Sequence, residues 1–90
     1  MLDNLNNLIQ LIRERKEKPI EGSYTNKLLS DKSLSKAKIL EEINELIDAV
    51  KKDTNKIHES ADVLYHLIVY LEANGIKIED VMDELKKRRK

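Results

Sequence analysis

The chain has 90 residues, no cysteine, and 17 basic and 17 acidic side chains, so its formal net charge is zero. This length predicts a single domain over residues 1–90, with a core that is small for a monomer. A chain without cysteine forms neither disulfides nor thiolate zinc sites, and self-association is then the expected support for such a core. The balanced charge provides no overall basic field to attract nucleic acid.

The distribution of apolar residues argues against a membrane protein. The longest apolar-rich stretch, residues 63–71, is too short to cross a bilayer, and the N-terminus lacks the pattern of a secretory signal. The absence of cysteine fits a reducing compartment. We therefore expect a cytoplasmic protein without a membrane partner.

Apolar residues recur at helical spacing along most of the chain, and one proline and two glycines leave few places to turn. The first stripe begins at Leu2 and predicts a helix that ends by Lys18, because Pro19 disfavours helical geometry at the residue before it. Ser23 is the expected N-cap of a short helix through Leu29.

Three further helices are predicted, over residues 33 or 35 to 52, residues 55–73 and residues 78–88. Residues 53–55 should end the first of these helices and offer caps for the second. Gly75 should end the second helix in a left-handed conformation. The basic run 86–90 is expected to be a solvated helix end. Helix 55–73 is apolar nearly all round and needs cover on most sides. The sequence thus predicts an all-α bundle of four to five helices, pooled in a homodimer or a higher oligomer.

Two pairs of acidic residues stand out from this pattern. Glu42 and Glu45 lie three residues apart at the edge of one apolar stripe, and Glu59 and Asp62 repeat this spacing on the next helix. If the two helices pack antiparallel, the four carboxylates converge. Such a group needs a cation, and a ligand set of oxygen atoms favours Mg²⁺, with Mn²⁺ as the alternative.

The simpler interpretation is that these acids form a solvated helix face. Asp62 argues against it, because its surroundings in the sequence are apolar and a near-buried acid without a partner is uncommon. His66, one turn further on, is expected to be a hydrogen-bonded core group, or a group that supports a metal ligand, and not a ligand itself.

The spacing Glu42-x-x-Glu45 followed by Glu59-x-x-Asp62 resembles the E-x-x-E…E-x-x-D signature of the MazG-like all-α nucleotide pyrophosphohydrolases. Three flanking segments are similar to motifs of the phosphoribosyl-ATP pyrophosphatase family within that superfamily. They are PIEGSYTNKLL (19–29, against P-x-G-S-Y-T-x-K-L-L), ESADVLYHLIV (59–69, against E-x-A-D-L-L-Y-H-L-L-V) and NGIKIEDV (74–81, against G-I-x-L-x-D-V). One departure is Leu40, where the family usually has glycine. If that glycine allows close approach of the substrate or of a neighbouring helix, Leu40 should alter the rim of the substrate pocket.

The resemblance implies a hydrolase that cleaves phosphoribosyl-ATP to phosphoribosyl-AMP and pyrophosphate, the second step of histidine biosynthesis. It implies Mg²⁺ on the four paired acids, Glu42, Glu45, Glu59 and Asp62, with the attacking water deprotonated by Glu41 or by a ligand such as Glu42 or Glu45. The implied substrate-binding residues are Ser23, Tyr24, Thr25, Lys27 and Lys38, with Arg13 as a weaker candidate.

Two other functions remain open at this point. A MazG-like house-cleaning enzyme that hydrolyses ordinary or damaged nucleoside triphosphates would use the same acids, and segment 22–27 argues against it. A non-catalytic helical dimerisation module would leave the acids solvated. It would show no effect of metal on stability.

Overall fold

The computed structural model describes residues 1–89 and arranges them in five helices, with no β-strand among these residues. The helices are α1 (Asp3–Glu17), α2 (Tyr24–Ser30), α3 (Lys32–Lys52), α4 (Lys56–Ala73) and α5 (Ile78–Arg88). The predicted all-α class is confirmed. Within the described part of the chain, no helix is both long and apolar enough to cross a membrane.

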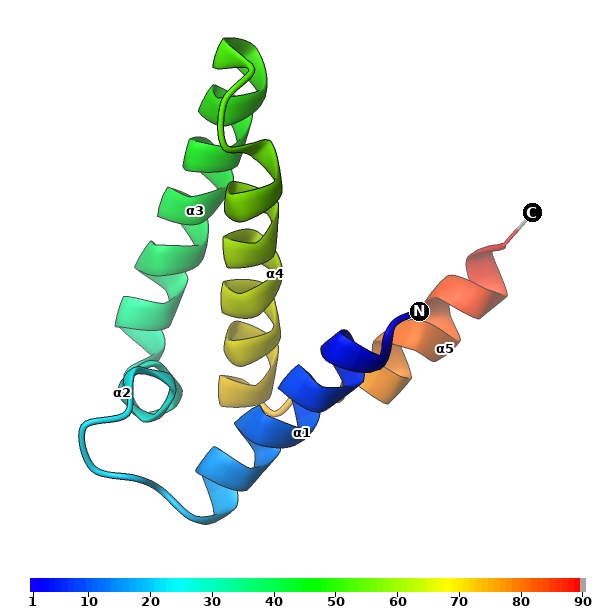
Figure 1. The fold of residues 1–90 in the computed structure, drawn as a ribbon. Coiled ribbons are helices and arrows are strands. Elements are labelled where there is room, and N and C mark those ends of the chain that lie inside the picture. The colour runs from blue at the N-terminus through cyan, green and yellow to red at the C-terminus, as the bar shows by residue number, and fades with distance from the viewer. Residues whose placement is uncertain (90) are drawn as a thin grey trace.

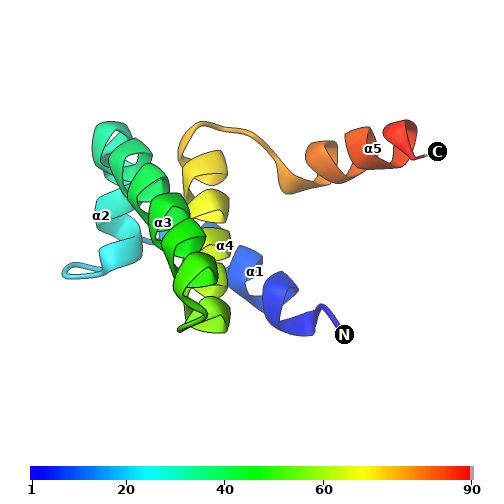
Figure 2. The ribbon, with the colours of Figure 1, turned by 90° about the horizontal axis from the view of Figure 1, so that it is seen from above.

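The centre of the molecule is an antiparallel hairpin of α3 and α4 (Figure 1). The short helix α2 lies across the base of α3, and α1 runs beneath the same end of the hairpin. Seen from above, α5 projects away from the other four helices (Figure 2). The arrangement leaves the upper part of the hairpin without cover from α1, α2 or α5.

The hydrophobic core lies at the base of the hairpin. It is formed by buried side chains from α1, α2 and α4, which are Ile9, Ile12, Leu28, Ile68 and Val69. Partly buried leucines of α1, with Leu29, Leu34, Tyr65 and Ile78, surround it. The face that α3 turns to α4 is different, because its buried residues are the small Ser35 and Ala49. Apolar burial therefore stabilises one end of the hairpin and leaves the other end for polar groups.

Local signals in the sequence explain most helix ends. The Ser23 hydroxyl accepts a hydrogen bond from the Asn26 backbone N–H at 3.3 Å and caps α2, as predicted. Helix α4 ends at Ala73, and Gly75 closes it as predicted, with φ of +70° and the Ile76 N–H donating back to the Leu71 carbonyl at 2.9 Å. Helix α1 stops before the Lys18–Pro19 bond, also as predicted.

Two predicted boundaries were wrong in detail. Helix α3 begins at Lys32 and not at a serine, because the Asp31 carboxylate accepts from the Leu34 N–H at 3.0 Å and caps it one residue after α2 ends. Asn55 precedes α4 in a left-handed conformation with φ of 48°, and its side chain makes no capping hydrogen bond. Both errors arose where several capping residues stand close together.

Arg13 joins three helices through charged groups. Its Nε donates to Glu72 of α4 at 3.1 Å, and its Nη1 donates to Glu79 of α5 at 2.8 Å. Arg13 lowers the pKa of Glu79 from 4.5 to about 2. This contact therefore contributes stability above the unfolded pKa, and the contribution is lost as the pH falls towards 2. The weak prediction that Arg13 binds substrate is not supported by this placement, since the guanidinium is committed to the helix junction.

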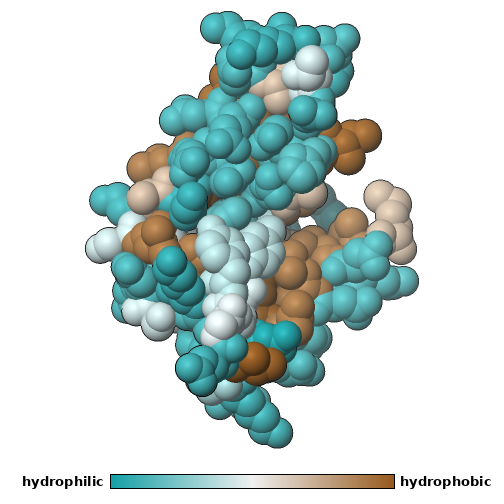
Figure 3. Space-filling model, turned by 60° about the vertical axis from the view of Figure 1, so that its left-hand side comes forward, coloured by the Kyte–Doolittle hydropathy of each residue, from teal (hydrophilic) through white to brown (hydrophobic). Residues whose placement is uncertain are grey.

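Several apolar side chains remain exposed in the single chain. On α3 they form one stripe with heptad-like spacing, and their exposed fractions are 55% for Leu40, 37% for Ile43, 57% for Ile47 and 59% for Val50. We call these four residues the outer stripe. Figure 3 shows one face of the molecule, where an apolar area in the lower half adjoins a largely hydrophilic surface above it. Helix α5 has no buried residue.

The burial of Ile12 gives a test of the core. Ile12 is fully buried, whereas its neighbour Leu11 is 39% exposed. We expect Ile12→Ala to lower the free energy of unfolding by about 2–5 kcal/mol, because it leaves a cavity. The control Leu11→Ala should cost less than half as much. Urea unfolding at matched protein concentration measures both, and equal losses would contradict the described core.

Candidate active site on the α3–α4 hairpin

Three of the four predicted metal ligands meet between α3 and α4. Glu42 and Glu45 of α3 and Glu59 of α4 each offer a carboxylate oxygen, and the three oxygens lie within 4.8 Å of one another. The antiparallel hairpin produces this meeting, because the i, i+3 pair on α3 faces the first turn of α4. We call Glu42, Glu45 and Glu59 the acidic cluster.

The acidic cluster contains groups that the protein itself does not satisfy. One carboxylate oxygen of Glu42 and one of Glu59, both Oε2, are buried without a hydrogen-bond partner. Burial first, and then the nearby Glu45 carboxylate, raises the pKa of Glu42 and of Glu59. Partly buried carboxylates of like charge, two of them with a buried and unpartnered oxygen, match what a hard divalent cation requires of its ligands. The residues present therefore fit a site for a hard divalent cation.

Asp62 lies beside the acidic cluster and faces His58, which was not predicted to belong to the site. Its Oδ2 is 3.3 Å from Nε2 of His58, and ligand atoms of His58, Glu59 and Asp62 lie within 4.8 Å of one another. Glu59 thus belongs to both groups. The i, i+4 spacing of His58 and Asp62 on one helix could have indicated this contact. His58 was not considered because it lies one residue before the Glu59-x-x-Asp62 motif.

Glu41 does not join the carboxylates. It is exposed and accepts a hydrogen bond from Nζ of Lys38 at 3.2 Å. This contact with Glu41 raises the pKa of Lys38, so that the lysine stays charged. Lys38 also acts on Tyr24 of α2, where its charge opposes the rise in the tyrosine pKa that burial causes. The Lys38–Glu41 pair therefore lies on the side of α3 that faces the start of α2.

The segment from Gly22 to Lys27 is held in place by its own side chains. Gly22 adopts φ of +83°, which favours glycine, and Ser23 then caps α2. Asn26 accepts from the Ile20 N–H at 2.9 Å and donates through Nδ2 to the Arg15 carbonyl at 2.7 Å. Asn26 had no predicted role, because nothing in the sequence shows which backbone groups a loop asparagine will bind. These bonds fix the loop between α1 and α2.

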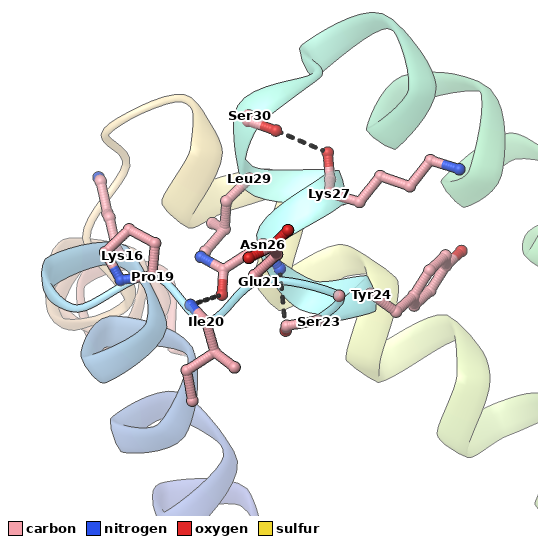
Figure 4. A pocket seen from close by; sticks show the side chains of 11 residues that line it. Lys16, Pro19, Ile20, Glu21, Ser23, Tyr24, Asn26, Lys27, Leu29 and Ser30 are labelled. Carbon is pink, nitrogen blue, oxygen red and sulfur yellow. Dashed lines mark hydrogen bonds between the residues drawn. The ribbon is translucent and has the colours of Figure 1, made fainter.

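A surface cavity of about 870 Å³ lies along this loop. Ser23, Tyr24 and Lys27 line it together with Lys16 and Pro19 of the α1 end, and none of the four predicted metal ligands does. Figure 4 shows the side chains of Tyr24 and Lys27 extending to the same side, away from Lys16 and Pro19. Thr25 differs from its neighbours, because it is buried and its hydroxyl shares a hydrogen bond of 2.6 Å with the Tyr65 hydroxyl.

His66 connects this loop to the acidic helix. Its ring is buried, with Nε2 at 3.1 Å from the Tyr24 hydroxyl and Nδ1 at 2.9 Å from the Asp62 backbone carbonyl. The ring is thus a hydrogen-bonded core group, as predicted. The Tyr24 ring is stacked on Tyr65 at a centroid distance of 6.4 Å.

Leu40, the departure from the family pattern, lies on the outer stripe of α3 with more than half of its surface exposed. Around the helix it is well separated from Glu42, because two residues correspond to about 200°. Its side chain therefore extends an apolar surface, and the predicted effect on the rim of the substrate pocket is not favoured by this position.

The five helices of residues 1–89 place the chain among the all-α proteins. Within that class it is one that carries a cluster of carboxylates between the two helices of a hairpin. The model of the family described as "Phosphoribosyl-ATP pyrophosphohydrolase" matches residues 5–89. The chain belongs to this family.

Named relatives agree with this assignment. The chain is 46% identical over 88 residues to the phosphoribosyl-ATP pyrophosphatase of Clostridium acetobutylicum, a match that covers 93% of this chain and 79% of that protein. It is 42% identical over 90 residues to the enzyme of the same name from Methanococcoides burtonii, with 94% and 91% covered. The histidine biosynthesis bifunctional protein HisIE of Pyrococcus furiosus is 44% identical over 90 residues, and this chain spans 43% of its length.

The acidic cluster predicts an unusual response of stability to metal. Because burial and like charge raise the pKa of Glu42 in the folded chain, ionising it opposes folding, and stability falls as the pH rises through and above its unfolded value of 4.5. Without divalent metal at pH 7, Glu42→Gln should therefore raise the thermal midpoint. With Mg²⁺ the wild-type chain should gain more than the variant, since binding to the folded state stabilises it.

Differential scanning calorimetry with and without Mg²⁺ measures these shifts. Asp48→Asn is the matched control, because Asp48 lies on α3 outside the acidic cluster and is paired with Lys52. Its gain with Mg²⁺ should equal that of the wild type. The described electrostatics would be contradicted if metal-free Glu42→Gln had a lower thermal midpoint than the wild type. They would also be contradicted if Mg²⁺ raised the midpoint of Glu42→Gln as much as that of Asp48→Asn.

Proposed function

We propose that this chain hydrolyses phosphoribosyl-ATP to phosphoribosyl-AMP and pyrophosphate, which is the second step of histidine biosynthesis. The acidic cluster, with its two buried and unpartnered carboxylate oxygens, carries this proposal. Membership of the family supports the choice of substrate. The reaction adds water across the bond between the α and β phosphates, and pyrophosphate leaves. We place it in the cytoplasm, where a cysteine-free chain of a biosynthetic family is expected.

The proposed ligands of the metal are Glu42, Glu45, Glu59 and Asp62. Mg²⁺ bound there would neutralise charge on the phosphate oxygens and lower the pKa of a bound water. The four carboxylates would hold this metal on two rigid helices, so that its position would be set by the packing of α3 on α4. Asp62 is also within reach of His58.

The proton of the attacking water has three candidate acceptors, Glu41, Glu42 and Glu45. An ion pair with Lys38 at 3.2 Å engages Glu41, and a carboxylate paired with a cation is a weaker base. Glu42 and Glu45 lie in the acidic cluster itself, next to where the water would be held. We therefore propose Glu42 or Glu45 as the general base. Glu41 would instead orient Lys38 through their ion pair.

The substrate would lie between the acidic cluster and the loop before α2. Its phosphate groups need cations, and Lys27 and Lys38 are the proposed ones. Ser23 and Tyr24 line the loop cavity beside Lys27. Thr25 was predicted to bind substrate as well, but its buried hydroxyl is bonded to Tyr65, so we propose that it supports the loop from inside.

The central prediction concerns two acid substitutions. Glu45→Gln and Asp62→Asn should each reduce pyrophosphate release from phosphoribosyl-ATP in Mg²⁺ by at least about 100-fold, because each removes a proposed ligand. Circular dichroism should show unchanged helix content. Asp48→Asn on α3 is the control for a charge change outside the acidic cluster. Near-wild-type rates in both variants would show that the metal is bound elsewhere.

Substrate choice is tested with the same assay. Phosphoribosyl-ATP and a panel of deoxynucleoside triphosphates are compared with and without Mg²⁺. We expect turnover of phosphoribosyl-ATP only, and only with metal. Turnover of the deoxynucleotides alone would establish the house-cleaning function instead. If no substrate is turned over and Mg²⁺ does not change the stability, a non-catalytic module is favoured.

We also propose that the chain forms a homodimer through the outer stripe. Leu40, Ile43, Ile47 and Val50 present a contiguous apolar face with the 3–4–3 spacing that packs helix against helix, and α1, α2 and α5 leave the upper hairpin uncovered. A second copy of the same hairpin would bury this face in a four-helix arrangement.

Ile47→Glu tests the dimer. A charge in an apolar helix interface is costly, so the variant should be monomeric at micromolar concentration in light scattering, while the wild type is dimeric. Asp48→Lys is the control, since Asp48 lies outside the outer stripe and the variant should stay dimeric. A monomeric wild type at the same concentration would contradict the proposal.

A further inference from the structure

The Tyr24 hydroxyl is the start of a hydrogen-bonded connection between α2 and α4. It lies 3.1 Å from Nε2 of His66, and Nδ1 of the same ring lies 2.9 Å from the Asp62 carbonyl. Tyr24 is the first residue of α2, and Asp62 carries one of the carboxylates proposed to bind metal. The chain of contacts thus runs from the substrate loop to the turn of α4 that carries Asp62.

The partners decide where the protons lie. A backbone carbonyl only accepts hydrogen bonds, so Nδ1 of His66 must carry the ring proton and donate it to Asp62. In the neutral ring Nε2 then has a free lone pair, and the Tyr24 hydroxyl must donate to it. For the neutral ring, the Asp62 carbonyl thus fixes the direction of both hydrogen bonds, because it can only accept.

Packing holds the two rings in this arrangement. His66 is 6% exposed and meets the Tyr24 and Tyr65 rings edge-on, at centroid distances of 5.9 Å and 5.0 Å. Tyr65 also holds Thr25, the residue after Tyr24, through the hydroxyl bond of 2.6 Å. The start of α2 is therefore attached to α4 by two neighbouring residues.

We propose that Tyr24 is a positioning residue, whose hydroxyl is committed to His66 and thereby sets the distance between the substrate loop and the Asp62 turn of the acidic helix. Tyr24 acts through His66 and does not use its hydroxyl to bind substrate. The inference rests on the proposed function, because it assigns the loop after Gly22 to substrate binding. It also changes the role that the family resemblance suggested for Tyr24.

The test is a double-mutant cycle on the full chain, with Tyr24→Phe, His66→Leu and the double variant. Removing one neutral hydrogen bond should raise KM for phosphoribosyl-ATP by about 3- to 10-fold and change kcat by less than about twofold. In the His66→Leu background, Tyr24→Phe should then change KM by less than about twofold. An equal effect of Tyr24→Phe in both backgrounds would mean that the hydroxyl contacts the substrate directly, and would overturn the proposal.

Two further variants separate positioning from loss of packing. His66→Gln keeps an acceptor for the Tyr24 hydroxyl, so its KM should lie closer to the wild-type value than that of His66→Leu. Tyr70→Phe removes a hydroxyl on α4 that takes no part in the Tyr24–His66 connection, and should leave KM unchanged. A KM for His66→Gln as high as that of His66→Leu would contradict the connection.

Two measurements test the connection without any activity. Urea unfolding of the wild type, the two single variants of the cycle and the double variant should show coupling between Tyr24 and His66. A long-range ¹H–¹⁵N spectrum of the wild type at neutral pH should show the ring proton of His66 on Nδ1. Additive losses of stability, or a proton on Nε2, would overturn the inference. If the wild-type chain does not hydrolyse phosphoribosyl-ATP while coupling and tautomer are as expected, the proposed function fails and the connection stands.

Discussion

The packing of α3 against α4 determines the rest of the structure, because it holds like charges together in a partly buried place. Glu42, Glu45 and Glu59 repel one another there, and two of their oxygens lack partners. Such an arrangement opposes folding of the metal-free chain. The stability that offsets it comes from a different place, the apolar core at the base of the hairpin, where Ile12 and Val69 are fully buried. Separation of core and acids allows a small domain to carry both.

Helix α2 links these two regions. Leu28 belongs to the core, whereas Tyr24, one turn earlier, is bonded to the helix that carries the acids. The capping bond of Ser23 and the two bonds of Asn26 fix the loop before it. The seven residues of α2 therefore connect the core rigidly to the loop and to the helix that carries the acids. This rigidity is what a site with two separate binding regions requires.

The helices and the acid pairs followed from spacing alone, because helical periodicity and the positions of Pro19 and Gly75 are local properties of the sequence. The meeting of Glu42 with Glu59 also followed, since only the antiparallel turn had to be assumed. What could not be predicted depends on contacts distant in the sequence. Arg13 has its partners 59 and 66 residues away, and the Tyr24–His66 bond spans 42 residues. Periodicity contains no information on such pairs.

Helix α3 must serve three surfaces at once, and its sequence separates them around the axis. At about 100° per residue, Ser35, Glu42 and Ala49 fall on the side that faces α4. Lys38 and Glu41 lie on one flank of it, towards Tyr24, and the outer stripe lies on the other flank. A partner bound to the outer stripe would thus leave the Lys38 flank open. The proposed substrate site and the proposed dimer contact would therefore use different faces of the helix, and leucine at position 40 enlarges the apolar flank without narrowing the polar one.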